Sequence, residues 1–464
     1  MGSTKCENGI PPTLKCCLFE WRPQNALIVQ RSARHVNELI NASRPRSFSK
    51  FPYTRQRNVV RYYSGKRSSV YLTSFIHREE LFDITERWLS NQLLPTDGLR
   101  LTQILICDGF VLGETLESVT RSLLSRIGAT KYRMDRIQFK GELRELICKS
   151  AGTRNSVVGR LVGQYRKNPD FFYVEAPING STCIDEDDRI LGVFRIKRPR
   201  RIAEKANRYI ANWIFRMVQE RATHMAEERA RSLGIPLRYL LTPEEEMTRE
   251  FGRAEESIAQ GFREGSIKLD RPALTINDVG GIKIIADDET LALVEESLQN
   301  DRLFRVCERE EHKGFYRARS LIIEVPWDRK RVVERYVDGR AWERYLNRGL
   351  REEDLSKGIE SLLNNVEPTI RLELILSTFP DLVESELGLS IHEERIAAQR
   401  DTKVYRGYVP MNVEFLVEYL FALGLSPRTH IDRLPVKLWG RYLPDTISYH
   451  IRQLYCAPEY DALY

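Results

Sequence analysis

The sequence lacks the signatures of several large protein classes. Its 464 residues are 42% hydrophobic and 30% charged, the balance of an ordinary soluble protein. No stretch holds the roughly 18 apolar residues that a membrane-spanning helix requires. The N-terminus also lacks the apolar block of a secretory signal. We therefore expect a cytoplasmic protein with no membrane partner, long enough for about two or three domains.

Cysteine and histidine motifs are also missing. The eight cysteines are scattered, only Cys16 and Cys17 are adjacent, and no CxxC pair occurs. This usage argues against a zinc ribbon or a disulfide framework and favours a reducing compartment. The seven histidines form neither an HD pair nor an HExxH motif, so a histidine-rich metallohydrolase is not expected. No GxxxxGK[ST] or GxGxxG loop occurs, so neither a P-loop nor a kinase glycine-rich loop would hold a nucleotide.

Positive charge is present in modest excess and is unevenly spread. The formal net charge is +7, and the stretch from Arg22 to Arg78 holds twelve Lys or Arg with Glu38 as its single acid. Residues 1–69 are therefore predicted to form a basic, weakly ordered arm. The arm is either simply solvated or neutralises the phosphates of an RNA such as tRNA.

Strand and helix patterns predict an α+β protein with a mixed sheet flanked by helices. Residues 70–187 are predicted to form a mixed α/β companion domain, in which 101–113 is a candidate buried strand and turn. Residues 188–400 interleave strands and helices around a helical insertion at 206–268. Residues 401–464 are predicted to be a C-terminal helical extension. The strands expected in the central region are 276–286, 304–308, 315–326 and 369–377.

Two carboxylates stand out in these strands. Asp278 precedes the glycine pair Gly280 and Gly281 at the start of one strand, and Glu373 lies inside another. Two carboxylates on neighbouring strands suit Mg²⁺, which binds few protein ligands and keeps substrate phosphates and water. By themselves, Asp278 is also typical of a turn or cap and Glu373 of a solvent-facing strand position.

Basic side chains accompany the two acids. A cluster at a strand-to-helix junction is either a solvated helix start or a phosphate-binding group, and two arginines lie on the hairpin strand. Phosphoryl transfer needs such a combination of metal-holding acids and phosphate-holding bases. The residues of the cluster are Arg195, Lys197, Arg198, Arg200, Arg201 and Lys205, and those of the hairpin are Arg317 and Arg319.

Four segments, in order, resemble the successive motifs of the RelA/SpoT synthetase domain. They are FRIKRPRRIAEK (194–205), DVGGIKII (278–285), GFYRARSLIIEVP (314–326) and IRLELILST (370–378). The resemblance covers about 200 residues, 190–398, and implies a nucleotidyltransferase-like core. It also implies a pyrophosphokinase that moves pyrophosphate from ATP to the 3′-hydroxyl of GDP or GTP.

The resemblance assigns roles by position. Asp278 would hold Mg²⁺, and Glu373 would assist the metal or take the proton of the attacking hydroxyl. Phosphates of ATP would bind Arg195, Lys197 and Lys205. Tyr316 would stack on the guanine of the acceptor. Lys283, Arg317 and Arg319 would be further nucleotide-binding residues.

The sequence departs from the family at several of these positions. Lys283 stands where the family has an arginine. The hairpin histidine of the family is replaced near Ser320, and Ile375 and Ser377 stand where the family has a glutamine and an arginine. No HD pair is present, so a companion hydrolase is not expected. Two alternatives stay open: a toxin-type enzyme that pyrophosphorylates the 3′ end of tRNA, and a degenerate domain that only binds nucleotide or RNA. The sequence does not indicate an oligomeric state.

Overall fold

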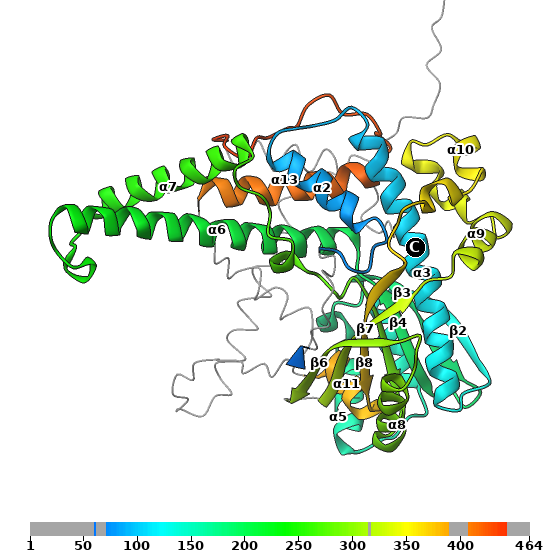
Figure 1. Cartoon of the computed structure of the whole chain (residues 1–464). Helices are drawn as coiled ribbons and strands as arrows, with labels where there is room; N and C mark the ends of the chain where they lie inside the picture. Colours follow the sequence, from blue (N-terminus) through cyan, green and yellow to red (C-terminus); the bar gives the residue numbers. More distant parts are fainter. Residues whose placement is uncertain (1–59, 62–70, 314–316, 389–406, 443–464) are drawn as a thin grey trace, which may run out of the picture. The chain divides into compact units, whose positions relative to one another are not determined.

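One mixed β-sheet runs through the part of the chain that the structure describes (Figure 1). The computed structural model describes residues 60–61, 71–313, 317–388 and 407–442, all within one unit, Arg57–Tyr464. The strand order is β1-β6-β7-β8-β5-β4-β3-β2, and every neighbouring pair is antiparallel except β5 and β8. The strands are β1 (Val60–Arg61), β2 (Tyr132–Phe139), β3 (Pro177–Asp185), β4 (Ile190–Ile196), β5 (Gly280–Ile285), β6 (Arg305–Lys313), β7 (Arg317–Pro326) and β8 (Thr369–Ser377). The predicted combination of a mixed sheet with helices is therefore confirmed.

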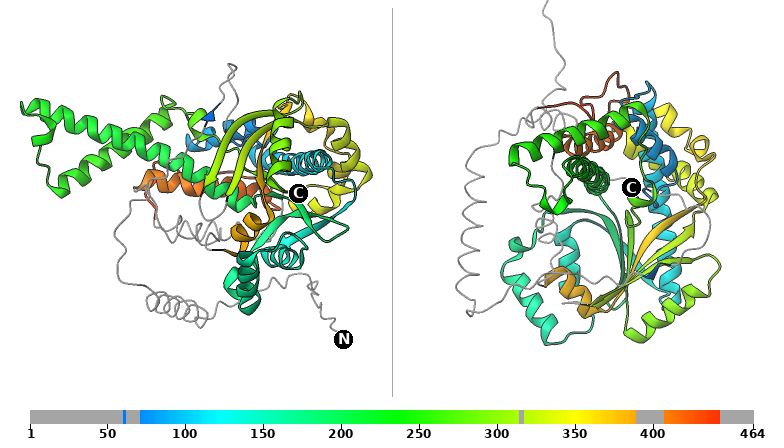
Figure 2. Two further views of the ribbon diagram at one scale, coloured as in Figure 1. Left: turned by 90° about the horizontal axis from the view of Figure 1, so that it is seen from below. Right: turned by 60° about the vertical axis from the view of Figure 1, so that its left-hand side comes forward.

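Helices cover both faces of the sheet (Figure 2). One face packs against α3 (Asp97–Arg126) and α8 (Asp288–Gln299). The other is covered in part by α4 (Lys140–Lys149), α5 (Ser156–Lys167) and α11 (Phe379–Leu387). Side chains alternate between the two faces along each strand, so one face is more deeply buried than the other. On β8, residues 370, 372, 374 and 376 are buried, whereas 371, 373 and 375 are half-buried on the opposite face.

A second group of helices packs beside the sheet. The helix α6 (Pro199–Ser232) begins just after β4 and pairs with α7 (Glu244–Glu264), which ends at Gly265 in a left-handed cap. The same α6 packs on α13 (Tyr408–Leu425), which also contacts α3 and α2 (Arg78–Leu89). Short elements complete the described chain: η1 (Pro169–Phe172), η2 (Leu237–Tyr239), η3 (Pro272–Leu274), α9 (Arg329–Asp338), η4 (Ala341–Arg348), α10 (Glu352–Ser356) and η5 (Glu360–Leu363).

The apolar helix α13 is the single candidate membrane span in the described residues. Its 18 residues have a mean hydropathy of 1.2, so the helix is long and apolar enough to cross a membrane. However, 72% of these residues are buried inside the fold. Leu416, Leu420 and Leu423 lie in the main hydrophobic core. This burial is that of a core helix in a soluble protein.

Two sequence predictions require correction. Residues 101–113 are part of α3 and not a strand; the segment is buried on nearly all sides, so its apolar run carries no helical periodicity. The boundary at 187/188 falls between β3 and β4, which pair antiparallel in one sheet, so 70–187 is not a separate unit. Nearly all of the predicted basic arm lies outside the described residues, as do 401–406 and 443–464 of the predicted C-terminal extension.

Candidate functional site

A row of register partners places a cation and a carboxylate on one face of the sheet. Arg195 of β4 pairs with Gly281 of β5, and Gly281 pairs with Glu373 of β8. Residues opposite each other on neighbouring strands point to the same side. Gly281 has no side chain, and a Cβ there would lie 3.7 Å from Oε2 of Glu373. Arg195 and Glu373 therefore flank a glycine on the polar face.

The adjacent glycine serves packing. A Cβ on Gly280 would lie 2.8 Å from Cδ1 of Leu112, a residue of α3. That distance is shorter than a carbon–carbon contact allows, so any side chain at this position would force Leu112 of α3 to shift in the packed core. The two glycines thus serve opposite faces of one strand.

Asp278 is held by two lysines just before β5 begins. Its Oδ2 lies 2.7 Å from Nζ of Lys197, which follows β4, and 2.6 Å from Nζ of Lys205 in α6. The Lys197 ammonium also donates to the backbone carbonyl of Asp278. Burial raises the pKa of Asp278, but Lys197 and Lys205 lower it more, so its pKa lies below the ordinary value. Asp278 is therefore an ion-pair residue and not a turn cap.

One oxygen of Asp278 has no partner. Oδ1 is buried and accepts no hydrogen bond, although the carboxylate is ionised. A buried carboxylate oxygen without a donor is costly unless a ligand satisfies it. Glu373 has separate partners, because its Oε1 accepts a hydrogen bond from Oγ of Ser320 in β7 at 3.3 Å. An unsatisfied oxygen on Asp278 and a carboxylate on Glu373 are the kind of donors that Mg²⁺ takes.

Beneath α11 the polar face holds a buried charge network. Glu386 of α11 lies 3.1 Å from Nζ of Lys140 and 3.6 Å from Nη1 of Arg195. Its backbone carbonyl accepts from Nε of Arg144 at 3.0 Å. Burial raises the pKa of Glu386, but Lys140, Arg195 and further cations lower it more, so its pKa lies below the ordinary value. The network ties α4 and α11 to β4 and anchors Arg195.

Lys283 is another buried cation of this face. It is 8% exposed, and its Nζ donates to Oγ of Ser385 in α11 at 3.2 Å. Burial lowers the pKa of Lys283 to about 8, against a weaker raising effect of Glu386. Lys283 points to the same side of β5 as Gly281 but lies under α11. We therefore regard Lys283 as a residue of the buried network and not as a contact for nucleotide phosphates.

The hairpin arginines do not join the site. Arg319 pairs in register with Leu376, on the opposite face of the sheet from Glu373, and its Nη1 lies 2.8 Å from Oε2 of Glu295 in α8. Arg317 lies two residues before Arg319 and therefore on the same face of β7, and its backbone N–H donates to the carboxylate of Asp381. Tyr316, the proposed guanine platform, lies outside the described residues. Of the predicted residues, the structure brings Asp278, Lys197 and Lys205 together, and it puts Arg195 and Glu373 in one row. Among the described residues, no hydrogen bond or ion pair joins these two groups directly.

Sequence reasoning missed Glu386 and Lys140. A signal for Glu386 exists, because it lies four residues after Leu382 and three after Val383, in the buried stripe of α11. Lys140 and Arg144 are likewise spaced by four on the buried side of α4. An acid in the apolar stripe of a helix predicts a buried cation partner.

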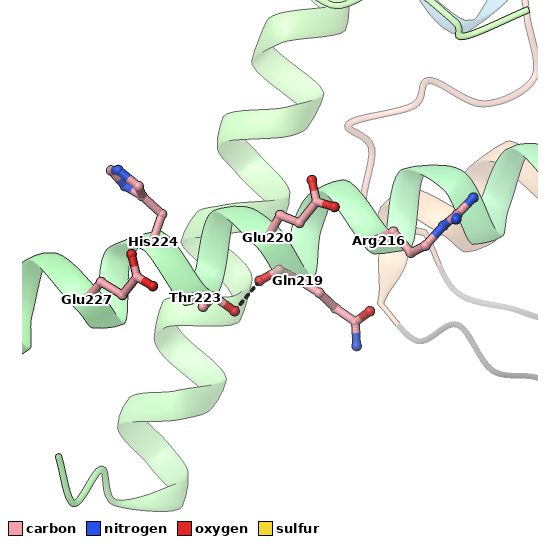
Figure 3. Close-up of a pocket in the computed structure, with 6 residues that line it drawn as sticks. All are labelled: Arg216, Gln219, Glu220, Thr223, His224 and Glu227. Atoms are coloured by element: carbon pink, nitrogen blue, oxygen red, sulfur yellow. Dashed lines mark hydrogen bonds between the residues drawn. The ribbon is translucent and has the colours of Figure 1, made fainter. Parts of the chain in front are cut away.

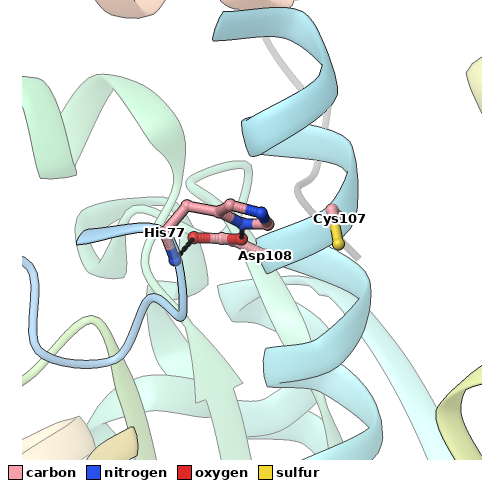
Figure 4. A group of neighbouring side chains, drawn as sticks. All are labelled: His77, Cys107 and Asp108. Atoms are coloured by element: carbon pink, nitrogen blue, oxygen red, sulfur yellow. Dashed lines mark hydrogen bonds and ion pairs between the residues drawn. The ribbon is translucent and has the colours of Figure 1, made fainter. Parts of the chain in front are cut away.

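His77, Asp108 and Cys107 form another buried cluster (Figure 4). Nδ1 of His77 is bonded to Oδ1 of Asp108, and Nε2 lies 2.8 Å from the carbonyl of Leu362. Both ring nitrogens face acceptors, so the geometry fits an imidazolium that donates twice. Burial lowers the pKa of His77, but Asp108 raises it more, and the net pKa lies above the ordinary value. With both nitrogens engaged, this cluster is a structural link between α2, α3 and the segment before β8.

A surface pocket on α6 lacks convergent groups (Figure 3). One helix face supplies all its lining residues, and each of them is exposed. Binding sites usually collect polar groups from separate elements, so we assign this pocket no chemistry. The residues are Arg216, Gln219, Glu220, Thr223, His224 and Glu227.

Comparisons with known proteins return no match: no family model, no curated protein and no solved structure matches this chain. The function is therefore argued from the chemistry of the site itself.

Proposed function

We propose that this chain is a nucleotide pyrophosphokinase that transfers pyrophosphate from ATP to the 3′-hydroxyl of GDP or GTP, with release of AMP. The observation that carries the proposal is the presence of two charged groups where β4 ends and β5 begins, one around Asp278 and the other on the polar face of the sheet. Asp278 lies between two lysines, and the neighbouring strands hold Arg195 and Glu373 on either side of Gly281. Phosphoryl transfer needs acids and bases in such proximity and little covalent chemistry from the protein.

Each side chain has a role in this proposal. Lys197, Lys205 and Arg195 are about one-third exposed and bind the phosphates of ATP. Oδ1 of Asp278 and the Glu373 carboxylate hold Mg²⁺, which would neutralise phosphate charge when bound. The low pKa of Asp278 keeps it ionised at neutral pH. Lys197 and Lys205 exchange their bond to Asp278 for bonds to the incoming phosphates.

A second candidate is a nucleotide-binding domain without catalysis. The hydrogen bond from Ser320 to Glu373 favours it, because the serine stands near the position of the family's hairpin histidine and engages the carboxylate. Under this alternative ATP binds to the same lysines, but no AMP is released. A tRNA acceptor in place of GDP or GTP is a further variant of the first proposal.

The test is an assay of the purified chain with labelled ATP and Mg²⁺. GDP, GTP and tRNA are offered in turn, and AMP and the labelled acceptor are quantified. Asp278→Asn and Glu373→Gln are expected to lower turnover by about a hundredfold or more. Glu289→Gln, an exposed acid on α8, is the matched control and is expected to keep full turnover.

The outcomes separate the candidates. AMP release with a guanine nucleotide supports the first proposal, and labelled tRNA supports its variant. ATP binding that requires Lys197 and Lys205 without AMP release supports the second candidate. If ATP binding is unchanged in Lys197→Ala and Lys205→Ala, the Asp278 group is not the nucleotide site and both candidates are wrong.

A further inference from the structure

A strongly basic surface lies on the α4–α5 segment. Residues 146–169 contain five Lys or Arg and no Asp or Glu. All five cations are exposed, and they form what we call the α5 basic surface: Lys149, Arg154, Arg160, Arg166 and Lys167. In Figure 1 this segment belongs to the layer that covers the polar face of the sheet.

Two guanidinium groups of this surface converge without a carboxylate between them. Nη2 of Arg154 and Nη2 of Arg166 both donate to the backbone carbonyl of Cys148, at 3.2 and 3.3 Å. Lys149 is the next residue along the chain. Like charges gathered at one carbonyl repel one another unless an anion neutralises them.

Two nearby acids are engaged elsewhere, whereas Asp170, directly before Phe171, is exposed. Glu142 of α4 accepts from the backbone N–H groups of Gln138 and Phe139, and Glu145 is hydrogen bonded to Tyr165. The ion pairs among the described residues include none of the five cations of the α5 basic surface. The surface therefore carries positive charge available to an external polyanion.

Exposed aromatic rings follow directly after the basic helix. Phe171 and Tyr173 are 44% and 46% exposed. Phe171 lies edge-on to buried Phe172 with 5.5 Å between ring centroids, and Phe172 lies 5.3 Å from Tyr165 of α5. Through these two ring contacts, Phe171 lies close to the last turn of α5, which carries Arg166 and Lys167. A solvent-facing ring next to free cations is the usual combination for stacking a base while holding its phosphate.

We propose that the α5 basic surface, with Phe171 and Tyr173, binds a single-stranded nucleic acid. A membrane surface fits less well, because the exposed side of α5 presents only Val157 as a large apolar residue, whereas interfacial helices insert several. The proposal does not depend on the pyrophosphokinase activity.

The test measures binding of a fluorescent 20-nucleotide single-stranded RNA to the full chain across a salt titration. The variant Lys149→Ala/Arg160→Ala/Lys167→Ala removes three cations whose side chains form no hydrogen bond or ion pair with the described residues. It is expected to weaken binding by at least about tenfold and to reduce the slope of log affinity against log salt by about 2. A second variant, Arg154→Ala/Arg166→Ala, tests the converging pair.

Controls separate local contact from net charge. The variant Arg253→Ala/Arg302→Ala/Lys330→Ala removes the same charge from exposed positions elsewhere and is expected to keep affinity within about twofold. Phe171→Ala is expected to lose about fivefold or more, and Phe171→Trp to restore it. A parallel titration with single-stranded DNA shows whether the 2′-hydroxyl of RNA contributes to binding.

Several results would overturn the proposal. They are absence of RNA binding by the unmodified chain, equal losses in the basic-surface and control variants, or equal affinity for duplex and single strand. Binding to phosphatidylserine vesicles that needs the same cations, without RNA binding, would assign the surface to a membrane instead.

Discussion

Replacement of Lys283 by methionine should stabilise the protein at neutral pH. Lys283 is buried under α11, and burial lowers its pKa to about 8 from a value near 10.5 in the unfolded chain. Below pH 8 the folded state must keep a charged ammonium in a poorly hydrated site. A difference of about 2.5 pKa units corresponds to about 3 kcal/mol of lost stability at pH 7.

The effect has a defined pH dependence. Between the folded and unfolded pKa values the unfolded chain binds more protons, so this penalty fades as pH rises. The gain from Lys283→Met should therefore fall from about 3 kcal/mol at pH 7 to about 1 kcal/mol at pH 10. Ser385 loses one hydrogen bond but keeps its own bond to the carbonyl of Leu382 at 2.8 Å, so the loss there is small.

Urea unfolding of both proteins at several pH values measures this difference. Lys283→Arg, which keeps the charge and adds bulk, is the control and should destabilise at every pH. A stability difference between Lys283→Met and the unmodified protein that is constant from pH 7 to 10 would refute the reasoning. Destabilisation by Lys283→Met at pH 7 would show that the ammonium is a needed partner of the network.

Three further predictions concern stability and can be measured by urea unfolding. Glu386→Gln should cost about 3–5 kcal/mol, because it leaves buried cations without their counter-charge; a cost below about 1 kcal/mol would contradict the network. The stabilisation that His77 owes to its raised pKa is complete below about pH 6.5 and lost as pH rises through the folded pKa, so the difference between His77→Gln and the unmodified protein should shrink at alkaline pH and not grow. Gly280→Ala should cost about 1–3 kcal/mol through overpacking, whereas Gly281→Ala should change stability little; equal costs would contradict the assignment of the two glycines to opposite faces.

Local patterns predicted the central strands well. The strand 369–377 is present with the predicted bounds, and Asp287 caps the helix that follows β5, accepting from the N–H of Thr290 at 2.8 Å. These predictions succeed because alternation and capping are properties of neighbouring residues. The run 101–113 was predicted wrongly because a helix buried on all sides has no periodic pattern to read.

The site was only partly predictable, because its composition depends on strand register. Arg319 and Glu373 both lie on central strands, but a shift of one residue in register decides which face each occupies. Register places Arg319 beside Glu295 and Arg195 beside Gly281. The sequence of one strand does not give the register of its partner, and so Arg317 and Arg319 were predicted to bind nucleotide although they lie on the opposite face from Glu373. Glu386 was missed because an acid on a short helix is most often solvent-exposed.

The central claim is that Asp278 and Glu373 hold one divalent cation beside a phosphate-binding group of lysine and arginine. The most direct measurement is an anomalous difference map from crystals of the protein with Mn²⁺ and a non-hydrolysable ATP analogue. The account predicts one Mn²⁺ peak within about 2.5 Å of oxygens from both carboxylates, with triphosphate oxygens on Lys197 and Lys205. A peak that contacts neither carboxylate, with the nucleotide bound elsewhere, would contradict it.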